Sequence, residues 1–127
     1  MYKIEIKFDK LSFTAELNDS PTSKAIWDQL PIKSRVNIWG EEIYFEIPVD
    51  MPQEPHAREI LSVGELAYWP VGQAFCIFFG PTPVSTDDQP RAYSPVNSLG
   101  KILDDCDGLR SIQNQETVHI EQLGSTA

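Results

Sequence analysis

Two segments near the start of the chain alternate strictly between hydrophobic and polar residues. Residues 2–8 and 13–17 each place a hydrophobic side chain at every second position. A period of two with one polar face is typical of a β-strand that is buried on one side only. The short stretch Asp9-Lys10 between the two segments predicts a hairpin turn.

The pattern changes to a helical one after Leu17. Ser20 can cap a helix, and Pro21 suits a first helical position because proline lacks the backbone N–H that is unpaired there. Hydrophobic residues then recur at helical spacing as far as Leu30, and Pro31 ends the run. The sequence therefore predicts one short helix over residues 22–30.

The remaining hydrophobic segments are short and are separated by turn residues. Strands are predicted over residues 36–39, 42–48, 66–69, 74–79, 96–103 and 117–121, with proline-rich loops over 49–58 and 80–91. In the segment 42–48, Ile43, Phe45 and Ile47 share one face, and Glu42, Tyr44 and Glu46 share the other. A single helical turn is predicted over 109–112, and residues 125–127 are expected to form a frayed tail.

These elements predict one mostly-β domain over residues 1–127. Six to eight short strands with one helix and one or two helical turns favour a small closed β-barrel. Closure also protects the edges of strands that carry this many hydrophobic residues.

The net charge and the cysteines of the chain indicate which partners and which cellular location to expect. The formal net charge is −9, which disfavours binding to nucleic acid because phosphate backbones are repelled. No hydrophobic run approaches the length of a membrane span, and the first ten residues do not read as a signal peptide. Cys76 and Cys106 form no disulfide framework or metal motif, so we expect a cytoplasmic protein with free thiols.

Three segments resemble the cyclophilin-like family of small prokaryotic proteins of uncharacterised function. They are Trp39-Gly40-Glu41-Glu42-Ile43-Tyr44-Phe45, Gly64-Glu65-Leu66-Ala67-Tyr68-Trp69 and Ile77-Phe78-Phe79-Gly80-Pro81-Thr82-Pro83. The resemblance covers nearly the whole chain and implies a cyclophilin-type β-barrel. Segments 72–78 and 97–102 are also similar to strands of the true cyclophilins.

The chain departs from the true cyclophilins where their catalytic arginine would lie. The resemblance places that position near residues 43–47, and this segment offers Glu46 and no arginine. A cationic donor stabilises the twisted amide of prolyl isomerisation, whereas a carboxylate would repel the same electron density. We therefore expect no prolyl isomerase activity.

Other chemistry finds little support in the sequence. His56 and His119 lie in no recognisable catalytic triad and are interpreted as surface residues. No phosphate-binding glycine motif is present, and Asp104-Asp105-Cys106-Asp107-Gly108 lacks the spacing of a calcium loop, so it is interpreted as a solvated acidic turn. No metal and no cofactor are expected.

The remaining candidate site is a groove formed by aromatic side chains. Its predicted lining is Trp39, Tyr44, Glu46, Tyr68, Trp69, Phe79 and Thr82. One hypothesis is a non-catalytic module that binds a small molecule or a peptide there. The other is an enzyme that uses Glu46 as a general acid or base. Two further alternatives remain: the same surface joins two copies as a homodimer, or these aromatic residues complete the packing of the barrel.

Overall fold

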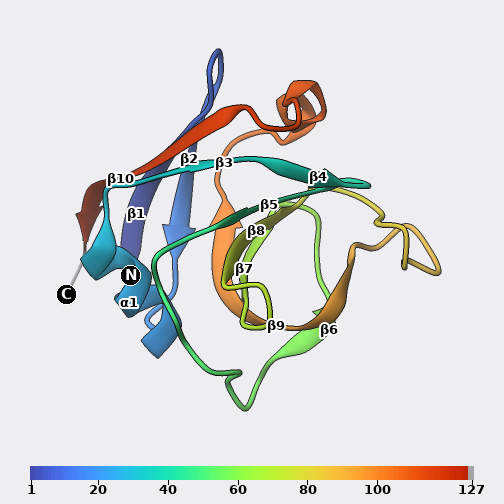
Figure 1. The fold of residues 1–127 in the computed structure, drawn as a ribbon, viewed down its shortest axis with the longest axis horizontal. Helices are drawn as coiled ribbons and strands as arrows, with labels where there is room; N and C mark the ends of the chain where they lie inside the picture. The colour runs from blue at the N-terminus through green and yellow to red at the C-terminus, as the bar shows by residue number, and fades with distance from the viewer. Residues whose placement is uncertain (126–127) are drawn as a thin grey trace.

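The protein is mostly β-sheet, as Figure 1 shows for the computed structural model, which describes residues 1–125. Ten β-strands, one α-helix and one 3-10 helix lie within that range. In chain order they are β1 (Tyr2–Lys7), β2 (Ser12–Leu17), α1 (Pro21–Gln29), β3 (Ile32–Arg35), β4 (Asn37–Trp39), β5 (Glu42–Glu46), β6 (Arg58–Ile60), β7 (Glu65–Trp69), β8 (Ala74–Phe78), β9 (Arg91–Ile102), η1 (Asp107–Ser111) and β10 (Thr117–Ser125). The predicted mostly-β class with one helix and a helical turn is confirmed.

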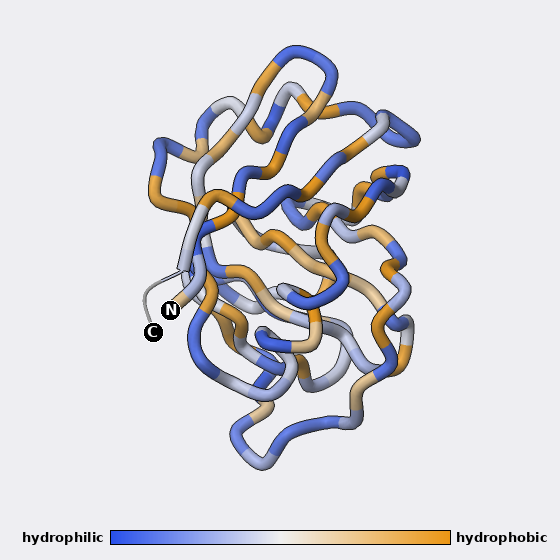
Figure 2. The backbone as a smooth tube through the Cα atoms, turned by 90° about the vertical axis from the view of Figure 1, so that its left-hand side faces the viewer, coloured by the Kyte–Doolittle hydropathy of each residue, from blue (hydrophilic) through white to orange (hydrophobic). Residues whose placement is uncertain are grey.

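Local sequence pattern explains the first elements directly. β1 and β2 pair antiparallel from Tyr2 opposite Leu17 onward, and Ile4 and Ile6 are fully buried. Figure 2 shows how hydrophobic and hydrophilic positions alternate along the chain. One face of this hairpin therefore packs on the core while the polar face meets solvent.

Helix α1 begins and ends close to the predicted residues. The Ser20 hydroxyl accepts a hydrogen bond from the Ser23 backbone N–H at 3.2 Å, and Pro21 occupies the first turn. At the other end, the Leu30 N–H donates to the Trp27 carbonyl. The capping serine and the proline that follows Leu30 thus set the helix boundaries.

Nine of the strands form one hydrogen-bonded path in the order β3-β10-β1-β2-β9-β7-β8-β5-β4, and β6 pairs with β9. The two ends of the path, β3 and β4, are separated in sequence by Val36 alone. Within residues 1–125 no strand ladder joins β3 to β4. The Ser34 hydroxyl of β3 donates instead to the Glu46 carbonyl of β5 at 2.7 Å. The sheet curves like a barrel, and the predicted closure is not confirmed.

The main core lies inside this curved sheet. Inward-facing side chains such as Ile6, Ile43, Phe45, Phe75 and Ile120 are each fully buried there. The rings of Phe45 and Phe75 stack with centroids 5.3 Å apart. Because β5, β7 and β8 alternate like any strands, their other side chains must point out of this core.

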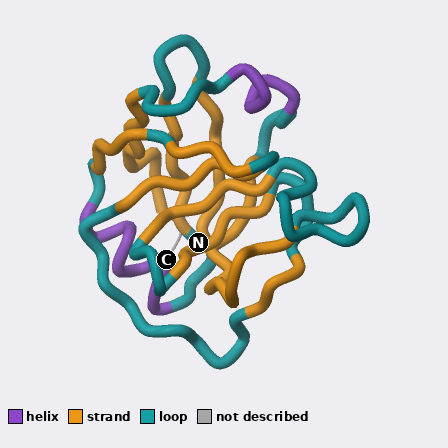
Figure 3. Tube along the Cα trace, turned by 45° about the vertical axis from the view of Figure 1, so that its right-hand side comes forward, coloured by secondary structure: helices purple, strands orange, loops and turns teal. Residues whose placement is uncertain are grey.

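A second, smaller core covers the outer face of β5, β8 and β7. It contains Leu61, Ala67, Cys76, Phe78, Ala92 and Val96. The first half of β9 curls across this face together with β6, as Figure 1 and Figure 3 show. The apolar run Ala74–Phe78 is consequently buried on both faces, which explains its lack of alternation.

Two strands and two strand ends differ from the prediction. β3 and β6 were not predicted, and β9 begins at Arg91 within the segment interpreted as a loop. Ser125, predicted to fray, is the last residue of β10, and residues 126–127 of the predicted tail lie outside the described residues. None of the described helices has the length and apolar character needed to cross a membrane.

Candidate functional site

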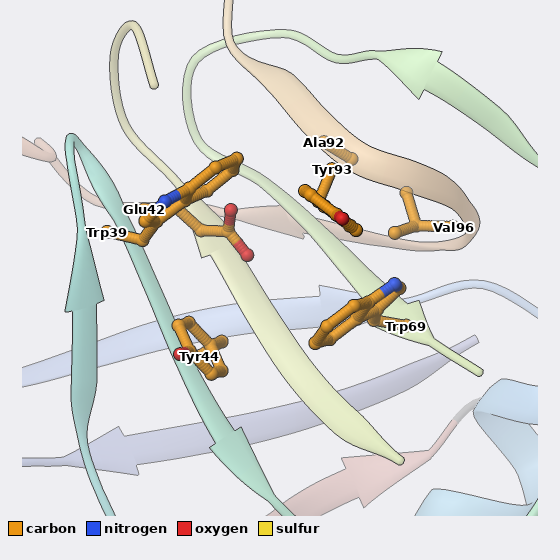
Figure 4. Close-up of a pocket in the computed structure, with 7 residues that line it drawn as sticks. All are labelled: Trp39, Glu42, Tyr44, Trp69, Ala92, Tyr93 and Val96. Carbon is orange, nitrogen blue, oxygen red and sulfur yellow. The ribbon is translucent and has the colours of Figure 1, made fainter. Parts of the chain in front are cut away.

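A pocket of about 220 Å³ opens at one end of the second core. Its lining consists of Trp39, Glu42, Tyr44, Trp69, Ala92, Tyr93 and Val96. These side chains come from four strands: the β4–β5 hairpin and, further along the sequence, β7 and β9. Figure 4 shows them pointing into one space, with the Glu42 carboxyl among the aromatic rings.

The alternation of β5 places two of these residues. Ile43 and Phe45 point into the main core, so Glu42 and Tyr44 point to the opposite face. The same rule applies on β7, where Tyr68 faces the main core and Trp69 faces the pocket. Each strand therefore serves the core with one set of side chains and the pocket with the other.

Four aromatic side chains form a connected series around the pocket. The ring centroids of Trp39 and Tyr93, of Tyr93 and Trp69, and of Trp69 and Tyr44 are each 6.2 Å apart. The ring planes of these pairs meet at 74°, 76° and 84°. Such edge-to-face contacts hold the rings as walls that stand at angles to one another.

The walls differ in how firmly they are held. The Trp69 indole N–H donates to the Ser94 hydroxyl at 2.6 Å, which fixes that ring. Tyr93 is 71% exposed and forms the outer wall, where its ring meets the rings of Trp39 and Trp69. Tyr93 is therefore the wall that can move most easily when a ligand enters.

Glu42 is the acidic group of the pocket and is only 5% exposed. Burial raises the pKa of its carboxyl from the ordinary 4.5 to about 7, opposed in part by a hydrogen bond with the Cys76 thiol. Burial, together with the nearby Glu42 carboxyl, raises the pKa of Cys76 well above its usual range. Near neutral pH, Glu42 can therefore gain or lose a proton easily.

Glu42 has no positively charged partner within residues 1–125, and neither Lys nor Arg lines the pocket. Glu65 provides a comparison, because Glu42 and Glu65 pair with the same residue, Phe78, from opposite sides. The Glu65 carboxylate forms an ion pair with Arg58 and accepts a hydrogen bond from Ser98 at 2.8 Å. Of these two buried carboxyl groups, only Glu65 is neutralised by the chain itself.

The structure brings together three of the seven residues predicted for the site. Trp39, Tyr44 and Trp69 line the pocket. Glu46 does not, because it lies exposed at the far end of β5. The carboxyl group in the pocket is that of Glu42, four residues earlier on the same face of the strand.

The other three predicted residues do not line the pocket and contribute to the packing and loop contacts of the fold. The Tyr68 hydroxyl, buried in the main core, donates to the Val49 carbonyl at 2.6 Å, and Phe79 also packs in that core. The Thr82 hydroxyl donates to the Arg91 carbonyl at 2.6 Å. Thr82 thereby ties the loop after β8 to the start of β9, the strand that carries Tyr93.

That loop also touches the β4–β5 hairpin. Gly40 has a φ of +59°, and a Cβ there would lie 2.8 Å from Pro83 and 2.9 Å from the Thr82 backbone. Glycine is required at such a position because it tolerates both the positive φ and the close approach. The contact fixes the hairpin that carries Trp39 against the loop that leads to Tyr93.

Ala92, Tyr93 and Val96 were not predicted as site residues, and neither was Glu42. Alternation on β5 was a usable signal for Glu42, since it shares a face with Tyr44. No local signal marked Tyr93, which lies between the loop predicted over residues 80–91 and the strand predicted over 96–103. Within the described residues, no group of three or more His, Cys, Asp or Glu side chains could hold a metal ion.

Comparison with known proteins gives the chain a family. Residues 2–121 match the family described as Cyclophilin-like. The hypothetical protein AF2241 from Archaeoglobus fulgidus, known from a solution structure, is 38% identical, with a TM-score of 0.83 over 96% of this chain and 95% of that chain. The chain therefore belongs to the Cyclophilin-like family.

A second solved structure shares the fold at lower identity. It is McbB in complex with tryptophan, which is 17% identical with a TM-score of 0.74. The alignment covers 98% of this chain and 46% of McbB, so the likeness concerns the fold of one part of that protein. No curated protein sequence matches the chain.

Proposed function

We propose that this member of the Cyclophilin-like family binds a small molecule in the pocket around Glu42 and does not act as a prolyl isomerase. The observation that carries the proposal is the convergence of four aromatic side chains and one buried carboxyl from four separate strands. Ligand sites typically combine mostly apolar walls with a few polar groups in this way.

The size of the pocket supports a small ligand over an extended peptide. Its volume of about 220 Å³ is below the roughly 300–1,000 Å³ that is usual for drug-sized ligands. A compact molecule with one apolar part and one donor or cationic group would fill it. The tryptophan complex of McbB, a protein of the same fold, makes indole and tryptophan sensible first probes.

The charge of the pocket supports the absence of isomerase activity. Its lining contains a carboxyl group and no guanidinium or ammonium group. Electrostatic stabilisation of a twisted prolyl amide needs a donor or a positive charge at the reacting bond. A tetrapeptide isomerisation assay should therefore show no rate above background, and catalysis there would contradict this part of the proposal.

The three tryptophans allow a direct test by ¹H–¹⁵N NMR. Trp39 and Trp69 line the pocket, whereas Trp27 packs on Tyr2 with ring centroids 5.0 Å apart and serves as an internal reference. Titration with indole, tryptophan and tetramethylammonium should shift the indole N–H signals of Trp39 and Trp69 with at least one probe and leave Trp27 unchanged. Shifts of all three signals alike, or no shift with any probe at millimolar concentration, would contradict the proposal.

The second candidate function is catalysis with Glu42 as general acid or base. The observation that favours it is the pKa of about 7, which suits proton transfer near neutral pH. A suitable probe is 5-nitrobenzisoxazole, whose N–O bond breaks when a base removes its ring C–H proton and so yields a cyanophenolate. A rate that rises with pH through about 7, is lost in Glu42→Gln and persists in Glu46→Gln would support the catalytic function. An equal rate in the unaltered protein and both variants would argue against catalysis by Glu42 and support the binding function alone.

A further inference from the structure

The pocket combines features that together fit one class of ligand. We propose that it binds a small organic ammonium cation carrying methyl groups, with the positive charge beside the Glu42 carboxylate and the methyl groups against the aromatic rings. This inference rests on the proposed function, since it names the ligand class of the same pocket.

The aromatic walls supply the first argument. Trp39, Tyr93, Trp69 and Tyr44 follow one another with centroids 6.2 Å apart and with planes that meet at 74° to 84°. Rings set at such angles surround a small volume from several sides, whereas parallel rings would favour a flat ligand between them. Aromatic faces attract cations within about 6 Å, most strongly those of tryptophan, and methylated ammonium groups are bound in this manner.

The charge of Glu42 supplies the second argument. Its carboxyl is buried without a cationic partner in residues 1–125, although the chain provides Arg58 for the neighbouring Glu65. A ligand that brings a positive charge would neutralise Glu42 as Arg58 neutralises Glu65. The net charge of −9 also favours the approach of cations to the protein.

The hydrogen-bonding groups of the pocket favour a methylated cation over a primary amine. A primary ammonium carries three N–H donors that each need an acceptor when water is excluded. The side-chain acceptors in the lining are the Glu42 carboxyl and the two tyrosine hydroxyls, and the other lining side chains are those of Trp39, Trp69, Ala92 and Val96. Methyl groups match this apolar wall, and each one added replaces a donor.

The decisive experiment compares choline with 3,3-dimethyl-1-butanol, an uncharged molecule of nearly the same shape. Calorimetric titration at about pH 8 and constant ionic strength should show choline binding at least about tenfold more tightly than the alcohol. Choline should also shift the N–H signals of Trp39 and Trp69 but not that of Trp27. Glu42→Gln should remove most of the preference for choline, and the matched control Glu46→Gln, on the same strand face outside the pocket, should retain it.

A pH series on the unaltered protein covers the case in which Glu42→Gln fails to fold. Because the pKa of Glu42 is about 7, its ionised fraction and the choline affinity should rise about tenfold from about pH 6 to about pH 8, while the alcohol's affinity stays constant. The other titratable groups facing Glu42 are the Cys76 thiol on β8 and the phenols of Tyr44 and Tyr93 on β5 and β9. From β4 and β7 only Trp39 and Trp69 line the pocket, and Glu65 of β7 forms its ion pair with Arg58.

The outcomes separate this inference from the proposed function. If the alcohol binds as tightly as choline or more tightly, or if only indole binds, the proposed preference for a cation is wrong, but the pocket remains a ligand site. Binding of choline that shifts Trp27 as strongly as Trp39 and Trp69 would overturn the assignment to this pocket. Failure of every probe would overturn both.

Discussion

Replacing Glu42 by glutamine should change how the stability of the fold depends on pH. In the folded protein the carboxyl is buried, and its pKa is raised from the ordinary 4.5 to about 7. Between these values the folded chain keeps a proton that the unfolded chain has lost. The stabilisation linked to that proton is therefore fully present below about pH 4.5 and is lost as the pH rises through about 7.

The magnitude follows from the two pKa values. One pH unit corresponds to about 1.4 kcal/mol, so the interval from 4.5 to about 7 amounts to about 3 kcal/mol. Glutamine has nearly the same shape and cannot ionise. Glu42→Gln should thus match the unaltered protein near pH 4.5 and exceed its free energy of unfolding by about 3 kcal/mol at about pH 8.

Urea unfolding followed by tryptophan fluorescence from about pH 4.5 to about pH 8 measures this difference. The two proteins share all other titrating groups, so the contributions of those groups cancel when the free energy of unfolding of one protein is subtracted from that of the other. Glu46→Gln is the control, because Glu46 is exposed on the same face of β5 and its replacement should give a flat difference. A difference between Glu42→Gln and the unaltered protein that does not change with pH would refute the reasoning.

Two further predictions concern the scaffold. Gly100→Ala should lower the free energy of unfolding by about 4 kcal/mol or more, because Gly100 has a φ of +147° and a Cβ there would lie 1.8 Å from the Glu16 carbonyl oxygen. In the same urea assay the control Gly124→Ala, whose Cβ would have nothing within 4 Å, should change that free energy by less than about 0.5 kcal/mol. Similar free-energy changes in the two variants would contradict the argument. A thiol reagent should modify Cys106 in the folded protein and reach the buried Cys76 only after unfolding, and equal rates under native conditions would show that the second core opens.

The elements that could be predicted from sequence are those whose pattern reflects one core. β1, β2 and α1 each bury a single face, so alternation or helical spacing marked them closely. β6 could not be found this way. It has three residues with only one half-buried, and its pairing with β9 depends on a strand more than thirty positions away.

β9 shows a different limit of the sequence pattern. Its twelve residues serve two sets of partners, since the first half pairs with β6 and the second with β7 and β2. A register shift separates its two pairings with β6, and Pro95 lies between them, where a missing N–H is tolerated. Pro90 at the end of the predicted loop and Pro95 inside β9 are thus compatible with the curled strand that carries Tyr93.

The site was predicted in part for the same physical reason. Alternation correctly assigned Glu42, Tyr44 and Glu46 to one face of β5, but it could not say how far β9 covers that face. Glu46 was favoured because the resemblance placed the isomerase arginine near it, whereas the pocket lies at the Glu42 end. Tyr68 and Trp69 are adjacent in a strand, so they could not both face the same groove.

The contrast between Glu42 and Glu65 connects stability with function. Both carboxyl groups are buried beside Phe78, and the chain neutralises Glu65 with Arg58. For Glu42 the cost of about 3 kcal/mol at alkaline pH remains, which is a substantial part of the 5–15 kcal/mol by which domains are usually stable. A cationic ligand would remove that cost on binding, so it should stabilise the fold most strongly at the pH where the empty pocket is least favourable.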